Sequence, residues 1–123
     1  MVVNIRTVQA LIVATVLLSP AALAHTKLAS SAPAEGAAVS APVEAIALIF
    51  EDAVRLTAVA LTDAAGAQRS LGDVPTEIAA DLVVEVRERL APGDYVIVWR
   101  AVGADTHVVS GEIRFSVAAA HAR

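Results

Sequence analysis

Most of the chain after residue 40 consists of short segments in which apolar and polar residues alternate. A period of two is typical of strands with one buried face, whereas helices give a period near 3.6 residues. The clearest segment is 109–117, where every second residue from Val109 is apolar or glycine and the residues between them are polar. Pro, Gly and Asp separate such segments and favour turns. The pattern therefore predicts an all-β fold.

Four further segments are predicted strands: a run that starts at Glu44 and carries Ile46, Leu48 and Phe50 on one face, then 54–62, 82–87 and 95–100. The segment 95–100 is apolar on both faces, which suits a central strand. Strands of this length and spacing favour a sandwich of two antiparallel sheets. The sequence predicts that the core contains four aromatic residues, namely Phe50, Tyr95, Trp99 and Phe115.

The N-terminal segment has the organisation of a signal peptide. Arg6 is the only charged residue before position 25, and the apolar stretch 10–18 is shorter than the roughly 20 residues that a membrane span needs. Small residues at Ala22 and Ala24 match a signal-peptidase site. We therefore expect residues 1–24 to be removed and residues 25–123 to form one exported domain.

Composition narrows the possible functions of this domain. The chain has a net charge of −4, and its acidic residues are scattered, so nucleic acid is not an expected partner. It contains no cysteine, which excludes disulfides and thiolate metal ligands. Any bound metal must therefore be held by nitrogen and oxygen.

The candidate chemistry lies at His25 and at the pair Asp105 and His107. Cleavage after Ala24 would make His25 the N-terminal residue, whose α-amine and imidazole can chelate one metal ion. Asp105 and His107 are two residues apart and share a face if they lie at a strand end. Nitrogen and oxygen donors suit copper(II), which also has the highest affinity in the divalent series.

Less specific interpretations of these residues also stand at this point. An Asp-x-His pair in a loop is often a solvated turn with a local hydrogen bond. A histidine after a cleavage site can be incidental to processing. His121 lies in the C-terminal tail, where we do not expect a ligand.

The mature sequence resembles that of CopC-type periplasmic copper-binding proteins. The resemblance extends over most of the domain and is carried by the segments 25–36, 46–51, 90–100, 105–107 and 111–117, together with Pro42. It implies an immunoglobulin-like Greek-key β-sandwich of about seven strands.

The same resemblance implies one copper(II) ion per mature chain. Its ligands would be His25, through amine and imidazole, with Asp105 and His107. Glu51 falls where the family places a carboxylate near the copper, so we expect it to support the site without being a ligand.

Two departures from the family pattern are visible. The family segment usually reads Ser-Ala-Asp-Gly-His-Pro, whereas here it is 103–108 with Thr106 in place of the glycine. If that position needs a positive φ, Thr106 would be strained. The only methionine is Met1, which leaves with the signal peptide, so a methionine-rich copper(I) site is not expected.

Three functions are compatible with the sequence, and we favour a non-enzymatic copper(II) carrier or buffer in copper resistance or homeostasis. Such a protein would be a periplasmic monomer that exchanges copper with an inner-membrane permease or other periplasmic copper proteins. The alternatives are a copper-dependent oxidative enzyme with a histidine-brace-like site and a metal-free immunoglobulin-like interaction module. Copper titration of the mature form separates the last from the others, and turnover with reductant and oxygen separates the first two.

Overall fold

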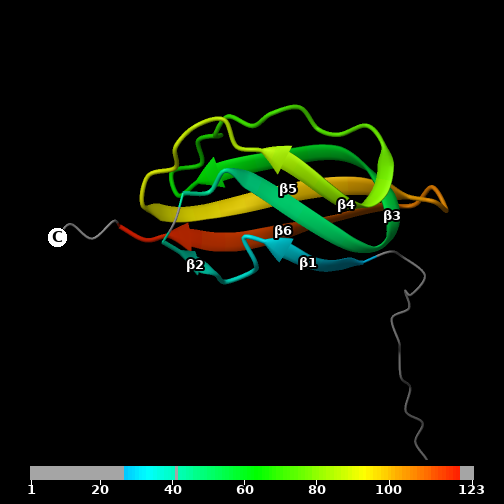
Figure 1. Cartoon of the computed structure of the whole chain (residues 1–123), viewed down its shortest axis with the longest axis horizontal. Helices are drawn as coiled ribbons and strands as arrows, with labels where there is room; N and C mark the ends of the chain where they lie inside the picture. The colour runs from blue at the N-terminus through cyan, green and yellow to red at the C-terminus, as the bar shows by residue number, and fades with distance from the viewer. Residues whose placement is uncertain (1–26, 41, 120–123) are drawn as a thin grey trace, which may run out of the picture.

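The computed structural model describes residues 27–40 and 42–119, and every regular element among them is a β-strand (Figure 1). The six strands are β1 (Leu28–Ala32), β2 (Ala38–Val39), β3 (Ala45–Asp63), β4 (Ile78–Glu85), β5 (Gly93–Gly103) and β6 (Val108–Val117). Within this described part, no helix is long and apolar enough to cross a membrane. The all-β prediction is confirmed, whereas the predicted signal peptide lies outside the described residues.

Strand β3 is one strand of 19 residues where the sequence analysis expected two. No proline or glycine interrupts the segment between Phe50 and Val54, so nothing ends the strand there. Its first part pairs antiparallel with β1 and β4, and from Val54 onward it pairs with β5. The described residues contain six strands, in keeping with the expected sandwich of about seven.

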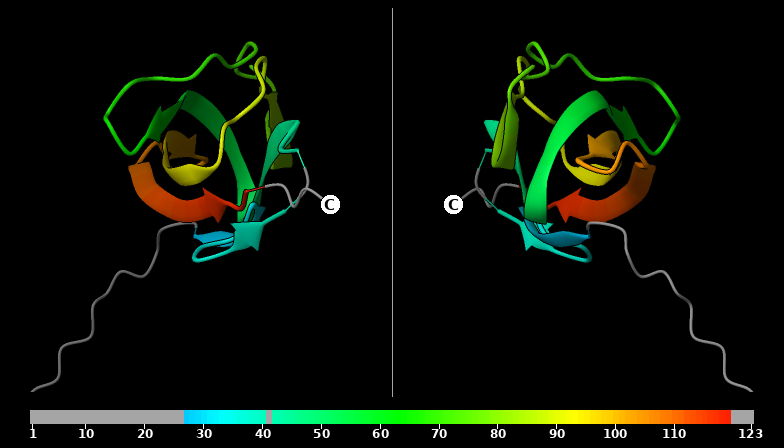
Figure 2. Two further views of the ribbon diagram at one scale, coloured as in Figure 1. Left: turned by 90° about the vertical axis from the view of Figure 1, so that its left-hand side faces the viewer. Right: turned by 90° about the vertical axis from the view of Figure 1, so that its right-hand side faces the viewer.

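The strands form a sandwich because β3 takes part in two layers. In Figure 1, β4 and the first part of β3 cross in front of β5, while β1 pairs with that first part of β3, and Figure 2 shows the strands curving around the interior from both ends. β5 is central, paired with β3 on one side and β6 on the other. The short strand β2 pairs with the end of β6 in parallel.

The core follows the alternation read from the sequence. In β4, Leu82 and Val84 are buried while Val83 and Glu85 are exposed. All four aromatic residues are buried, as predicted, and they form two contacting pairs. Phe50 and Trp99 meet edge to face with ring centroids 5.1 Å apart, and Tyr95 stacks on Phe115 at 5.5 Å. Burial of such large apolar side chains is the main stabilising contribution in a domain of this size.

Gly111 allows a close approach between β6 and the Trp99 ring. It is the β6 partner of Trp99, and a Cβ atom built on it would lie 2.8 Å from the indole Cζ2. Real Cβ contacts are essentially never this short, and the contacted atom belongs to a rigid, buried ring. The absence of a side chain at position 111 therefore permits the Trp99 indole to lie against β6.

We predict that Gly111→Ala lowers the free energy of unfolding by about 1 to 3 kcal/mol, because an overpacked core must shift side chains or backbone. Urea unfolding followed by Trp99 fluorescence measures the change. Ser110→Ala, at the neighbouring exposed position, is the control and should change the stability by no more than about 0.5 kcal/mol. Equal stability of Gly111→Ala and wild type would contradict this packing.

Candidate metal centre

A tight turn joins β5 to β6 and carries two of the candidate ligands. The Thr106 N–H donates to the Gly103 carbonyl at 2.9 Å, and the Gly103 N–H donates to the His107 carbonyl at 3.0 Å. Thr106 has a φ of +68°. A turn of this kind, in which the last loop residue is left-handed, is a standard connection of a hairpin with a short loop.

The turn brings Asp105 and His107 into direct contact. The His107 Nδ1 atom lies 3.0 Å from Asp105 Oδ2, and the His107 N–H donates to Asp105 Oδ1 at 3.1 Å. The His107 and Asp105 side chains are 64% and 45% exposed, respectively. Both side chains are therefore accessible from solvent, and they lie in the turn itself and not at a strand end.

His107 stabilises the charged form of Asp105. The imidazole hydrogen bond is the largest cause, and the backbone N–H of His107 is the second; together they hold the pKa of the Asp105 carboxyl below its ordinary value of 3.8. Asp105 is therefore a carboxylate at neutral pH. An ionised oxygen beside an imidazole is a donor pair suited to a divalent transition metal.

Thr106 has a positive φ, which is the conformation in which the sequence predicts strain. It is the one non-glycine residue with a positive φ among the described residues. A left-handed conformation costs an L-residue roughly 1 to 2 kcal/mol. The Thr106 hydroxyl donates to the Asp105 carbonyl, which adds a contact within the turn.

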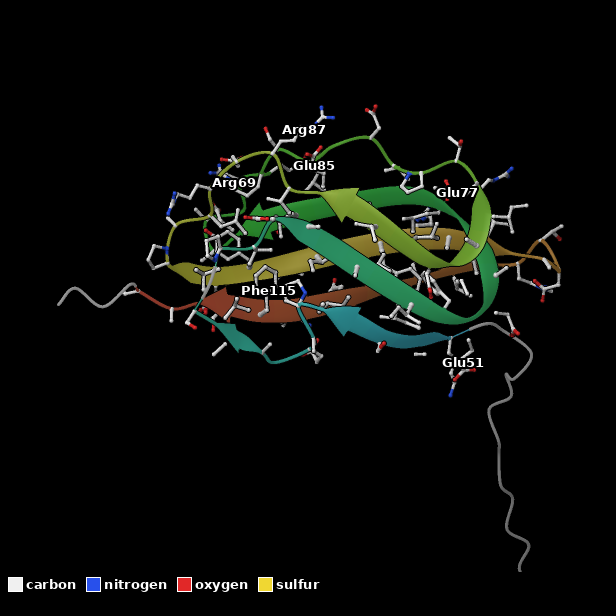
Figure 3. The ribbon with its side chains drawn as sticks, in the orientation of Figure 1. Glu51, Arg69, Glu77, Glu85, Arg87 and Phe115 are labelled. Atoms are coloured by element: carbon white, nitrogen blue, oxygen red, sulfur yellow. The ribbon has the colours of Figure 1, made fainter. Side chains whose placement is uncertain are left out.

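Glu51 lies beside Lys27, the first residue that the structure describes. Its N–H donates to the Lys27 carbonyl at 2.8 Å, and the preceding residue, Phe50, is the β3 partner of Leu28. Three residues further along β3, Val54 pairs with Gly103, the first residue of the turn. The start of β1, the exposed Glu51 and the β5–β6 turn therefore lie at one end of the sandwich (Figure 3).

The remaining candidates cannot be placed. His25 and His121 lie outside the described residues, and the described residues alone contain no group of three or more His, Asp or Glu side chains able to hold a metal. The structure thus joins Asp105 to His107 and brings Glu51 to the same end of the molecule.

Comparisons with known proteins agree on one family. A family model described as the CopC domain matches residues 28–118. Copper resistance protein C of Pseudomonas syringae pv. tomato is 32% identical over 125 residues, covering 95% of this chain and 99% of the relative. The protein of the same name from Xanthomonas campestris pv. juglandis is 35% identical over 120 residues, covering 85% and 89%.

Solved structures match the fold. CopC from Methylosinus trichosporium OB3b gives a TM-score of 0.71 over 80% of this chain and 99% of its own, at 23% identity, which supports the fold alone. PcoC, a methionine-rich copper resistance protein from Escherichia coli, gives 0.63 over 76% and 99%, at 33% identity. The likeness confirms the predicted β-sandwich.

We predict that His107→Ala raises the pKa of Asp105 part of the way to 3.8, because the imidazole is lost while the backbone N–H remains. A lowered carboxyl pKa contributes stability above 3.8, and this contribution is lost as the pH falls through the lower, folded value. The carboxyl carbon shift of Asp105, followed by NMR from about pH 6 to about pH 2, measures both midpoints. An unchanged midpoint in the variant would show that His107 does not stabilise the carboxylate.

Proposed function

This chain belongs to the CopC family, and from that membership we propose that it binds copper(II) and acts as a copper carrier or buffer in copper resistance or homeostasis. This is a family of copper resistance proteins and not of enzymes, so the proposed role is to hold and transfer the ion. The acting form is residues 25–123, exported to the periplasm after loss of residues 1–24. It binds one copper(II) ion through the amine and imidazole of His25, with Asp105 and His107.

The contact between Asp105 and His107 is the observation that carries the proposal. An ionised carboxylate and an imidazole lie 3.0 Å apart in an exposed turn, where an ion can reach both from solvent. The chain has no cysteine, and its donors of nitrogen and oxygen match the preference of copper(II). The donor chemistry therefore fits this ion.

The topology supports a contribution from the N-terminal residue. Lys27 is hydrogen-bonded to Glu51, at the end of the sandwich that carries the turn. His25 is two residues before Lys27, and two extended residues span at most about 7 Å. A new N-terminus at position 25 would therefore begin close to this end, so its amine and imidazole could complete a site that the turn starts.

The N-terminal histidine supplies what an internal histidine lacks. Its α-amine has a reference pKa of roughly 7.7 to 8.0, so copper(II) must displace a proton from it near neutral pH. The amine and imidazole then close a chelate ring on one ion. Glu51 lies at the same end of the sandwich, and we expect it to support the site without entering the coordination.

The proposed role also fixes the kind of partner. A mature domain of this size with one exposed site would act as a monomer and exchange copper with an inner-membrane copper permease or other periplasmic copper proteins. Its net negative charge makes nucleic acid an unsuitable partner.

We predict unequal losses of copper(II) affinity across the site. His25→Ala and His107→Ala each remove an imidazole and should weaken binding more than about 100-fold, whereas Glu51→Gln should fall within or below the 10- to 100-fold range typical of residues outside the coordination. Competition titration against a chelator of known affinity, on correctly processed protein, measures these losses.

Two matched controls accompany these variants. His121→Ala removes a histidine that we do not expect to be a ligand, and Asp52→Asn removes a charge next to Glu51. Both should bind as wild type does, apart from a small electrostatic change in Asp52→Asn. Full affinity in His107→Ala would refute the proposed site, and equal, total loss in all three test variants would make Glu51 a ligand.

A further inference from the structure

Thr106 separates the two candidate ligands of the turn and has a backbone conformation that threonine disfavours. Its φ is +68°, in the left-handed region that glycine, asparagine and aspartate enter most readily. A β-branched side chain is among the least suited to it. The local preference of Thr106 therefore opposes the conformation it has.

The hydrogen bonds of the turn hold Thr106 in this conformation. Its N–H donates to the Gly103 carbonyl at 2.9 Å, and the Gly103 N–H donates to the His107 carbonyl at 3.0 Å. The Thr106 hydroxyl donates to the carbonyl of Asp105. Relaxation of φ to a negative value would break the first two of these bonds, which close the hairpin.

The contact between Asp105 and His107 depends on the same conformation. In an extended strand, residues two apart are separated by more than about 6 Å along the chain, although their side chains point the same way. Here the chain reverses at residue 106, so the His107 N–H reaches Asp105 Oδ1 at 3.1 Å and the imidazole reaches Oδ2 at 3.0 Å. The backbone at residue 106 thus sets the relative orientation of the carboxylate and the imidazole.

We propose that Thr106 is a positioning residue, which restricts the backbone between Asp105 and His107 so that the two side chains keep one relative orientation before a metal arrives. The hairpin hydrogen bonds impose the positive φ against the preference of threonine, and a β-branched residue whose hydroxyl is bonded to the neighbouring carbonyl then has fewer other conformations to exchange with than glycine would have. The bonds that hold this conformation, from Thr106 to Gly103 and from Gly103 to His107, are backbone hydrogen bonds of the hairpin, so the fold itself sets it. A site that is ordered before binding has a higher affinity, because binding then costs less conformational entropy. The copper part of this inference rests on the proposed function.

The test compares Thr106→Gly with Thr106→Asn. Both residues enter the left-handed region more easily than threonine, so neither variant should be less stable than wild type in urea. Glycine also enters many other conformations, whereas asparagine keeps a Cβ atom that limits them. The pair therefore separates relief of strain from loss of positioning.

The first measurement uses metal-free protein and follows the amide hydrogen exchange of His107 and Gly103 by NMR. The added backbone freedom of glycine should speed exchange of both amides about two- to five-fold in Thr106→Gly, despite its undiminished global stability. Thr106→Asn should exchange as wild type does. Equal exchange in wild type and Thr106→Gly would overturn the proposal.

The second measurement is a copper(II) titration with electron paramagnetic resonance at one equivalent of copper. Thr106→Gly should bind about two- to five-fold more weakly and give a broadened spectrum, because its donors have several orientations. Thr106→Asn should give the wild-type spectrum. If the role of Thr106 is purely structural, copper(II) affinity should follow the stability of each variant. Undiminished affinity and an unchanged spectrum in Thr106→Gly would therefore overturn the positioning role. Absence of copper binding by wild-type protein, with faster exchange in Thr106→Gly, would support the positioning of the pair and overturn the proposed function alone.

Discussion

The arrangement of the whole domain depends on β3 passing from one layer of the sandwich to the other. Ile46 and Leu48 in its first part and Leu61 in its second are fully buried, so both parts must cover the same core. The β3–β4 pairing shifts register between Ile49 and Val54, and over the same stretch the pairing with β1 ends at Phe50 and the pairing with β5 begins at Val54. At this bend the start of β1 and the end of β5 both pair with β3, at positions only a few residues apart. One bent strand thus brings the beginning of the described chain to the turn that follows β5.

The turn itself results from a competition between local preference and tertiary hydrogen bonding. Thr106 alone would avoid a positive φ, but the bonds that close the β5–β6 hairpin outweigh this preference. The result is an exposed carboxylate held against an exposed imidazole. Such an exposed pair suits the proposed role of accepting an ion from solvent and releasing it to a partner.

Much of the fold could be predicted from the sequence because alternation is a local signal. It identified the buried faces of β4 and β6 and the four core aromatic residues. In β5 both faces are apolar, so alternation did not show that Ile97 is buried whereas Val98 is exposed. It did not reveal β1 and β2, which are short and consist largely of serine and alanine, nor the parallel pairing of β2 with β6, which joins residues far apart in the chain. The continuity of β3 was missed because the apolar pattern is interrupted at Glu51 and Asp52, whereas the hydrogen bonding is not. The spacing of Asp105 and His107 put them on one face of a strand end, whereas their contact arises in the turn. The family resemblance implied a supporting place for Glu51, but the hydrogen bond between Glu51 and Lys27 joins residues far apart in the chain and had no local signal.

The central claim is that copper(II) is held jointly by a processed N-terminus and the β5–β6 turn, and the α-amine of residue 25 is its most specific part. The most direct measurement is the copper(II) affinity of protein that begins at His25, compared with protein carrying one additional alanine before it. An added residue converts the amine to an amide and removes that donor, while the side chains of the site are unchanged. The extended protein should bind far more weakly, and its affinity should recover fully after the extra residue is removed. Equal affinity of the two forms would contradict the central claim.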